Sequence, residues 1–283
     1  MNENPLVSVI VITYNRKELL KETIDSILNQ TFEDFELIVV DNFSDYNFFS
    51  HIESFNDDRI RPFQNQNNGI VAVNRNFGIN NAKGKYIAFC DDDDLWLPEK
   101  LIKQITFIED SGCGMVCTML KRFGVTNVFS ERYGIGPLPF RQKTSRNDLL
   151  HSNCISNSSV LVKKSVLDEV GYFDERRSFV SLEDHDLWIR ISAVTKIQYI
   201  PEVLLLYRIH KSNLSQTIVS DNTNKGISEF YLTYGINKRR NQFRKGKNNV
   251  IINFLRNVLR LIIEFLFFKQ KKKIYLNISN RNK

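Results

Sequence analysis

Four consecutive aspartates at residues 91–94 are the residues best suited to bind a metal ion. Adjacent carboxylates repel one another, so such a run is usually tolerated only where water screens the charges or a cation neutralises them. Mg²⁺ and Mn²⁺ prefer oxygen ligands and are commonly held by one or two carboxylates together with substrate phosphates. The run therefore indicates a divalent-metal site for a phosphate-containing substrate.

Two simpler roles remain open for the same run. A solvated acidic loop needs no ligand, since runs of like charge usually lie in water. Asp94 is also suited to cap a helix beginning at Pro98 and Glu99, because proline is favoured in the first turn and an aspartate can accept from its free N–H groups. The position of the run directly after an apolar strand favours the metal site.

A second polar group, SLEDHDLW at residues 181–188, precedes an apolar helical pattern. Glu183 and Asp184 would lie at the start of that helix, where the helix dipole stabilises a carboxylate as the anion. A general base must be deprotonated before reaction, so Asp184 is predicted to be a catalytic base. Capping is the structural alternative, with Glu183 or Asp186 as other candidates for the cap. His185 points away from Asp184 and is not expected to be catalytic.

Apolar runs alternate with amphipathic stretches along the first half of the chain. This order predicts an α/β fold with a largely parallel sheet, in which ligands bind at the carboxyl ends of the strands. The expected strands are Val7–Thr13, Phe35–Val40 and Tyr86–Cys90, and the expected helices are Lys17–Leu28 and Asn74–Ala82, the latter stopped by Gly84.

Three of the expected strand ends carry polar or aromatic side chains. The first strand ends at Thr13, Tyr14 and Asn15, the second at Asp41 and Asn42, and the third runs into the four aspartates. Because parallel strands end at one edge of a sheet, these groups are expected to form one site.

Composition places the chain among ordinary globular proteins, with 42% apolar residues in 283. Its four cysteines lie in apolar or small-residue stretches and are expected to be reduced and packed, and Cys113 and Cys117 have no second pair that would suggest zinc. The N-terminal segment lacks a basic stretch ahead of its apolar run and is expected to be a strand, not a signal peptide. These features indicate a reducing compartment.

The net charge of +7 is unevenly distributed, with −5 in residues 1–220 and +12 in residues 221–283. The segment 250–268 is long enough to reach across a bilayer, but Arg256, Arg260 and Glu264 make one polar stripe along it. Basic clusters flank the segment, so we expect a helical, amphipathic tail that lies on an anionic membrane surface. Packing of this helix on the globular body is the alternative.

The motifs VSVIVITYNR, SILNQTFEDFELIVVD, NNGIVAVNRNFGINNAKGKYIAFCDDDDLWLPEKL, GYFDE, EDHDLWIRI and LYRIH occur in this order. Over residues 5–215 the chain resembles bacterial family 2 glycosyltransferases. The resemblance implies a Rossmann-like GT-A fold, a nucleotide-sugar donor such as UDP-Glc or UDP-Gal, Mn²⁺ or Mg²⁺ as cofactor, and inversion at the transferred sugar.

The resemblance also implies roles for individual residues. Tyr14, flanked by Thr13 and Asn15, would stack on the base, and Asp41 and Asn42 would contact base or ribose. Arg75 would approach the diphosphate, with a surface arginine on an exposed helix as the alternative. Asp91 or Asp92 would bind the ribose, and Asp93 and His210 the metal. Glu183 and Trp188 are expected on the acceptor side. The chain departs from many relatives at Asn42, where they have an acid, and at Phe43, where they have glycine.

The expected organisation is a nucleotide-sugar half at residues 1–110, an acceptor half of the same domain at 111–220 and the basic tail at 221–283. The expected acceptor is a lipid-linked saccharide such as a GlcNAc-diphosphate-polyprenol, used in O-antigen or capsule synthesis at the cytoplasmic face of a bacterial inner membrane. Two alternatives remain: a catalytically inactive GT-A scaffold, and a nucleic-acid-binding protein that uses the basic tail. The acidic body argues against nucleic acid as a partner.

Overall fold

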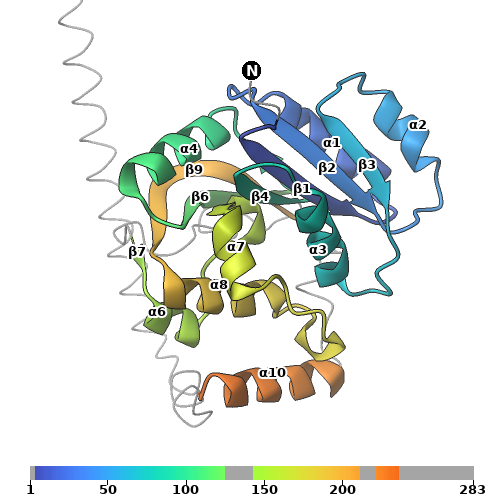
Figure 1. The fold of residues 1–283 in the computed structure, drawn as a ribbon. Helices are drawn as coiled ribbons and strands as arrows, with labels where there is room; N and C mark the ends of the chain where they lie inside the picture. The colour runs from blue at the N-terminus through green and yellow to red at the C-terminus, as the bar shows by residue number, and fades with distance from the viewer. Residues whose placement is uncertain (1–3, 125–142, 211–220, 236–283) are drawn as a thin grey trace, which may run out of the picture. The chain divides into compact units, whose positions relative to one another are not determined.

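The structure is a computed structural model that describes residues 4–124, 143–210 and 221–235. Nine strands in these ranges form one sheet in the order β3-β2-β1-β4-β8-β6-β9-β5, with β7 paired to β9. The strands are β1 (Val7–Thr13), β2 (Phe35–Asp41), β3 (Ile60–Gln64), β4 (Tyr86–Asp91), β5 (Leu95–Trp96), β6 (Met115–Gly124), β7 (Lys143–Thr144), β8 (Val160–Lys163) and β9 (Ile197–Ile209) (Figure 1).

The first half of the chain forms the parallel part of the sheet, as the sequence predicted. Strands β3, β2, β1 and β4 lie side by side in parallel. The first strand and the helix α1 (Lys17–Leu28) have the predicted bounds. Strands β2 and β4 each run one residue further than predicted, and the helix α3 (Val71–Asn81) begins three residues earlier. These strand ends bring Asp41 and Asp91 into the sheet itself.

The second half of the chain adds its strands to the same sheet. Strand β8 is antiparallel to both β4 and β6, and β6 pairs in parallel with β9. The long strand β9 also carries β5 along its edge, with Leu206 opposite Leu95. His210 directly follows β9, so this pairing returns it towards the end of the aspartate run.

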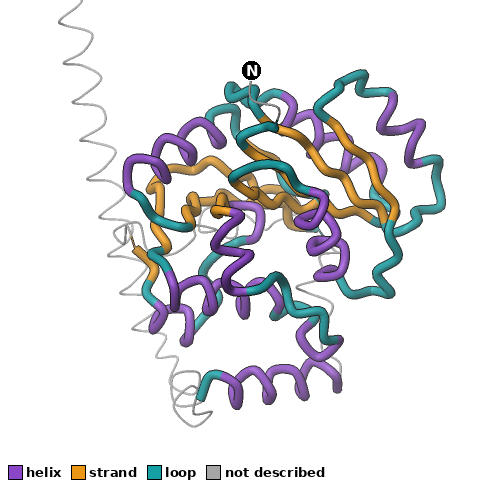
Figure 2. The backbone as a smooth tube through the Cα atoms, viewed as in Figure 1, coloured by secondary structure: helices purple, strands orange, loops and turns teal. Residues whose placement is uncertain are grey.

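Helices cover both faces of the sheet (Figure 2). On one face, leucines and isoleucines of α1 and α4 (Lys100–Ser111) share a buried cluster with Val7, Val9 and Val11 of β1. On the other face, α3 packs so closely on β1 that a Cβ at Gly78 would lie 2.6 Å from Cγ2 of Ile10. The remaining described helices are α2 (Phe48–Glu53), α6 (Arg146–His151), α7 (Lys164–Val170), α8 (Glu183–Val194) and α10 (Asp221–Thr233), with 3-10 turns η1 (Asn157–Ser159) and η2 (Arg177–Phe179).

Trp188 belongs to this second face and not to the acceptor side, so that prediction is wrong. Its side chain is fully buried, and Phe173 packs edge-on against both Trp188 and Phe89 of β4. A large aromatic ring with no exposed surface contributes to the core and cannot contact a substrate. The apolar positions of α8 therefore anchor the helix, while its first turn faces the site.

The four cysteines are thiols that form no disulfide, as predicted. Cys90, Cys113 and Cys117 are buried, and Cys154, which precedes η1, is partly exposed. Burial raises the pKa of the Cys90 and Cys117 thiols well above the ordinary value. Three of the four thiols are therefore inert packing groups.

A compact unit extends to Tyr234, so residues 221–234, which the sequence suggested belong to the tail, pack with the globular part. The helix α10 lies against η2, and Phe230 is buried among the rings of Phe179 and His185. The amphipathic segment 250–268 and its basic flanks lie outside the described residues. Within the described ranges no helix is both long and apolar enough to cross a membrane.

Candidate active site

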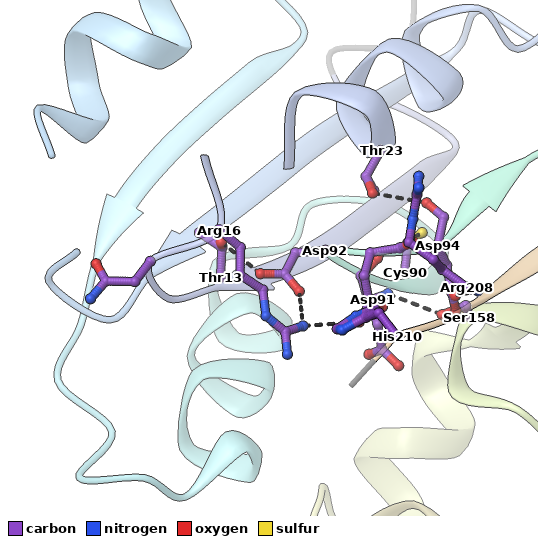
Figure 3. A network of polar contacts seen from close by, with 12 residues as sticks. Thr13, Arg16, Thr23, Cys90, Asp91, Asp92, Asp94, Ser158, Arg208 and His210 are labelled. Atoms are coloured by element: carbon purple, nitrogen blue, oxygen red, sulfur yellow. Dashed lines mark hydrogen bonds and ion pairs between the residues drawn. The ribbon is translucent and has the colours of Figure 1, made fainter. Parts of the chain in front are cut away.

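Asp91, Asp92 and Asp94 have different surroundings at and just beyond the end of β4 (Figure 3). Asp91 is partly exposed, and its Oδ1 accepts hydrogen bonds from Nη2 of Arg75 and Nδ2 of Asn157, both at 3.0 Å. Its backbone N–H donates to Oγ of Ser158 at 3.0 Å. Asp91 is thus fixed from two directions, by α3 and by η1.

Asp92 and Asp93 share a positive partner that the sequence analysis did not identify. Nη1 of Arg16 lies 2.8 Å from Oδ1 of Asp92 and 2.9 Å from Oδ2 of Asp93, and Oγ1 of Thr13 donates to Oδ2 of Asp92 at 2.8 Å. Burial raises the pKa of Asp92 to about 6, against the opposing effect of Arg16. The signal in the sequence was a basic residue two positions after Tyr14, at the end of the first strand.

Asp93 and His210, the two predicted metal ligands, lie in direct contact. Nε2 of His210 lies 2.9 Å from Oδ2 of Asp93. Two adjacent ligands of an octahedral ion, each about 2.1 Å from it, lie about 3 Å apart, so the pair fits a divalent cation. The described part of the chain contains no group of three or more His, Cys, Asp or Glu side chains suited to a metal. A cation at this pair would compete with Arg16 for Asp93.

Asp94 is a buried structural residue and does not cap the following helix, so that alternative is wrong. Strand β5 intervenes, and α4 begins at Lys100 after Glu99, which makes no side-chain capping bond. Oδ1 of Asp94 accepts from the backbone N–H of Arg208 at 2.9 Å. Burial, reinforced by Asp91 and Asp93, raises the pKa of Asp94 well above its ordinary value. Asp94 thereby ties the end of β9 to the aspartate run.

Arg75 lies in the centre of the site and is buried, which rules out the surface role. It donates from Nη1 to Oε1 of Glu183 at 2.8 Å as well as to Asp91. Burial alone would lower the pKa of Arg75, but Asp91, Glu183 and Asp184 outweigh it and hold the pKa above its ordinary value. The guanidinium therefore joins the end of β4 to the start of α8. Its predicted contact with the diphosphate stays a prediction.

Asp184 lies one residue beyond that junction, in the first turn of α8. Its Oδ2 accepts from Nδ2 of Asn153 at 3.2 Å, and its Oδ1 accepts from the N–H of His185. Burial raises the pKa of Asp184 to about 7; Glu183 adds to this and Arg75 opposes it. The helix terminus was expected to stabilise the anion, and desolvation overrides that effect. A carboxylate with a pKa near 7 is well matched to general-base work at neutral pH.

The two acidic neighbours of Asp184, Glu183 and Asp186, do not cap α8. The N-cap of α8 is Leu182, without a side-chain capping bond, so neither Glu183 nor Asp186 caps the helix. Asp186 is buried and accepts from Tyr234 and Arg190, which makes it a structural residue. His185 packs against Phe230, with Nε2 2.6 Å from the carbonyl oxygen of Leu149, in line with its predicted non-catalytic role. Glu183 pairs with Arg75, and its predicted place on the acceptor side stays a prediction.

A pocket of about 360 Å³ lies at the ends of β1 and β2, lined by Tyr14, Asn42, Phe43, Gln66 and Asn68. The predicted nucleotide residues Tyr14 and Asn42 therefore meet in one pocket.

Other predicted nucleotide residues support that pocket. Asp41 is fully buried and accepts from the N–H and hydroxyl of Ser44 and from Gln64, so it holds the loop; its predicted contact with base or ribose stays a prediction. Asn15 accepts from the N–H of Asp45 and its own N–H donates to Ser44, which places it in the same support. Thr13 contacts Asp92.

The sequence matches the family described as Glycosyl transferase family 2 over residues 8–171, more than half of the chain. The chain belongs to glycosyltransferase family 2. Its sheet and flanking helices are the GT-A fold.

A relative of this family 2 glycosyltransferase in Escherichia coli is the UDP-Glc:alpha-D-GlcNAc-diphosphoundecaprenol beta-1,3-glucosyltransferase WfgD. It is 28% identical over 222 residues, which cover 78% of this chain and 82% of WfgD.

Two solved structures share the fold. S. aureus TarS 1-349 in complex with UDP-GlcNAc has a TM-score of 0.64 at 20% identity, covering 76% of this chain and 61% of that one. The mannosyltransferase PcManGT from Pyrobaculum calidifontis, in complex with GDP-Man and Mn²⁺, has a TM-score of 0.57 at 19% identity, covering 75% and 59%. This glycosyltransferase thus spans less than two thirds of either solved chain.

A buried lysine that the sequence analysis missed lies behind the aspartate run. Lys100 donates from Nζ to Oε1 of Gln104 at 2.7 Å and lies 3.7 Å from the ring centroid of Trp96. Burial lowers its pKa to about 7. Gln104 and Trp96 in turn donate to the carbonyl oxygens of Ser159 and Ser158, so this group holds η1 against Asp91. A lysine inside a helical apolar pattern gives no sign of such a role.

Proposed function

We propose that this protein transfers a hexose from a uridine diphosphate sugar to a lipid-linked saccharide, with inversion at the anomeric carbon. The observation that carries the proposal is the Arg75 junction, which sets Asp184 beside the aspartate run through its contacts with Asp91 and Glu183. One carboxylate suited to act as a base thus lies next to groups suited to bind a nucleotide sugar.

The donor would lie along the ends of β1, β2 and β4. Its base would enter the pocket lined by Tyr14 and Asn42, and its diphosphate would reach Asp93 and His210. Three buried polar atoms around the Arg75 junction have no hydrogen-bond partner in the described structure, namely Arg75 Nε, Asn157 Oδ1 and Glu183 Oε2. Buried polar atoms are normally paired, so this capacity suits a ligand rich in hydroxyl groups.

The mechanism we propose is a single displacement. Asp184 accepts the proton of the acceptor hydroxyl as that oxygen attacks the anomeric carbon, and the bond to the diphosphate breaks on the opposite face. Arg75 and Asn157 hold Asp91 in place, while Arg75 also holds Glu183 next to the base. Asp93 and His210 would hold a divalent cation, which when bound would supply charge stabilisation for the leaving diphosphate. From an α-linked donor the product is a β-glycoside.

The lipid-linked acceptor is supported by the name of the relative WfgD, whose substrate is a GlcNAc-diphosphoundecaprenol. A polyprenyl carrier lies in a membrane, so an enzyme acting on it must work at that surface. The proposed location is the cytoplasmic face of a bacterial inner membrane, with peripheral attachment, and the proposed pathway class is synthesis of a surface polysaccharide such as O-antigen.

The test is a transfer assay with a panel of nucleotide sugars and a synthetic GlcNAc-diphosphate-lipid acceptor, in Mn²⁺ or Mg²⁺. We expect transfer from UDP-Glc or UDP-Gal, a β-linked product by NMR, and no transfer by Asp184→Asn. Glu202→Gln, on an exposed side chain that pairs with Lys103, is the matched control. A folded protein that neither transfers from nor hydrolyses any donor in the panel would instead be an inactive scaffold.

A further inference from the structure

Phe43 is a bulky side chain in a backbone conformation that such residues rarely adopt. Its φ is +58°, in the left-handed region that favours glycine, and its side chain is 57% exposed. A non-glycine residue there carries backbone strain that the surrounding structure must enforce. An exposed phenylalanine gains little from burial, so nothing in the folding of the loop accounts for this choice of residue.

Contacts on both sides of Phe43 impose this conformation. The side chain of Asp41 accepts from the N–H of Ser44 at 3.0 Å. Asn42 donates its N–H to the carbonyl oxygen of Thr13 at 3.0 Å, and its Oδ1 accepts from the N–H of Asn67 at 2.8 Å. None of these contacts uses the Phe43 side chain. Glycine or asparagine at position 43 would allow the same contacts with less backbone strain.

The Phe43 ring lines the same pocket as Tyr14, whose side chain is 54% exposed. The other lining residues are Asn42, Gln66 and Asn68, all neutral amides that can both donate and accept hydrogen bonds. Two exposed aromatic rings and three amides make a lining suited to a planar, uncharged, hydrogen-bonding group. A nucleobase is such a group, since each base has two faces for stacking and a polar edge.

We propose that Phe43 and Tyr14 hold the nucleobase of the donor between them, with the three amides contacting its edge. Phe43 is then a specificity-determining residue of this chain, and the contact with the base is the reason the strained phenylalanine is kept. This inference rests on the proposed function, because it takes the occupant of the pocket to be the nucleotide of a sugar donor.

The test compares binding of UDP and of inorganic pyrophosphate by titration calorimetry in Mn²⁺, together with the thermal unfolding midpoint. Phe43→Asn removes the ring with a residue that tolerates positive φ. Loss of one stacking ring should weaken UDP binding about 5- to 150-fold. Pyrophosphate affinity should not change, because that ligand has no base. The unfolding midpoint should stay the same or rise as strain is relieved.

Two further variants sharpen the experiment. Phe43→Tyr keeps an aromatic face and should retain UDP affinity. Phe49→Leu is the matched control, since Phe49 is another exposed ring, 44% exposed, on α2 and outside the pocket lining. It should change neither affinity.

Three results would overturn the proposed contact between Phe43 and the base. UDP affinity of Phe43→Asn within twofold of the wild type shows that the ring does not contact the base. Equal loss of UDP and pyrophosphate binding shows general damage to the site. A folded wild type that binds pyrophosphate but not UDP, GDP, ADP or dTDP overturns both this contact and the proposed function. The first two results leave the proposed function standing.

Discussion

Asp184 is the residue whose ionisation should set the pH dependence of transfer. Burial raises its pKa to about 7, and only the deprotonated carboxylate can accept a proton. We expect kcat to fall about tenfold per pH unit below 7 and to level off above it. A pH profile of kcat measured at saturating donor tests this. A profile that stays flat between pH 5.5 and 8 would assign the base to another residue.

Replacing Asp184 by asparagine keeps the shape of the side chain and removes the base. Transfer should fall by about 10²–10⁴, while UDP affinity changes little. Single-turnover transfer and calorimetric UDP binding, measured on the same preparation, separate the two effects. Parallel loss of both would mean that Asp184 holds the donor site together and is not the base.

Asp93 is expected to be the aspartate on which metal-dependent binding depends, because its Oδ2 faces His210. Asp93→Asn should weaken UDP binding in Mn²⁺ at least about 10-fold, since an amide is a poorer ligand for a hard cation. Wild-type binding in excess EDTA should fall to a similar level. Calorimetry measures both. Unchanged UDP affinity of the wild type in EDTA would contradict a metal role for this residue.

At the scale of elements, α10 depends on a close approach to η2. A Cβ on Gly226 would lie 1.6 Å from the carbonyl oxygen of Ser178, so alanine there must move one of the two segments. Overpacking of this kind typically costs about 1–3 kcal/mol. We expect faster hydrogen exchange in 221–233 and 177–179 for Gly226→Ala, by about 5- to 150-fold, with the core strands unchanged.

The control for this helix is Leu232→Ala, which shortens a side chain that is 82% exposed on the same element. Exchange in α10 should be close to that of the wild type. Equal acceleration in both variants would mean that α10 frays by itself and is not held by the Gly226 contact.

The parallel half of the sheet was predictable because each of its elements has a local signature. The strand Val7–Thr13 is mostly apolar and β-branched, and α1 repeats its buried residues at helical spacing. The site was only partly predictable, since Arg16, Asn157 and Arg208 act through partners far away in the sequence. No local pattern marks such pairs. The prediction for Trp188 was wrong because an aromatic residue next to polar residues is equally compatible with a surface and a core position.

At the scale of the whole molecule, the basic tail is predicted to bind a membrane surface. Residues 221–283 carry a net charge of +12, and each basic residue near an anionic surface contributes about 1 kcal/mol at low salt. Full-length protein should float with anionic vesicles at low salt and be released as ionic strength rises. A chain ending at Tyr234, the end of the compact unit, should stay in solution and keep its UDP affinity.

Flotation with neutral vesicles is the control for the charge dependence. If the full-length protein ignores anionic vesicles at low salt, the tail packs on protein instead. If it resists both high salt and alkaline extraction from cells, the segment 250–268 is buried in the bilayer. Salt-sensitive retention of DNA by residues 221–283 would support a nucleic-acid role.

The uneven burial of the four thiols gives this enzyme a natural reporter group. Cys154 alone among them is partly exposed, and it directly follows Asn153, whose amide contacts Asp184. A thiol-reactive fluorophore should therefore label the unmodified protein at a single position near the proposed base. Arrival of an acceptor saccharide could then be followed as a change in emission or as slower labelling, without removing any cysteine.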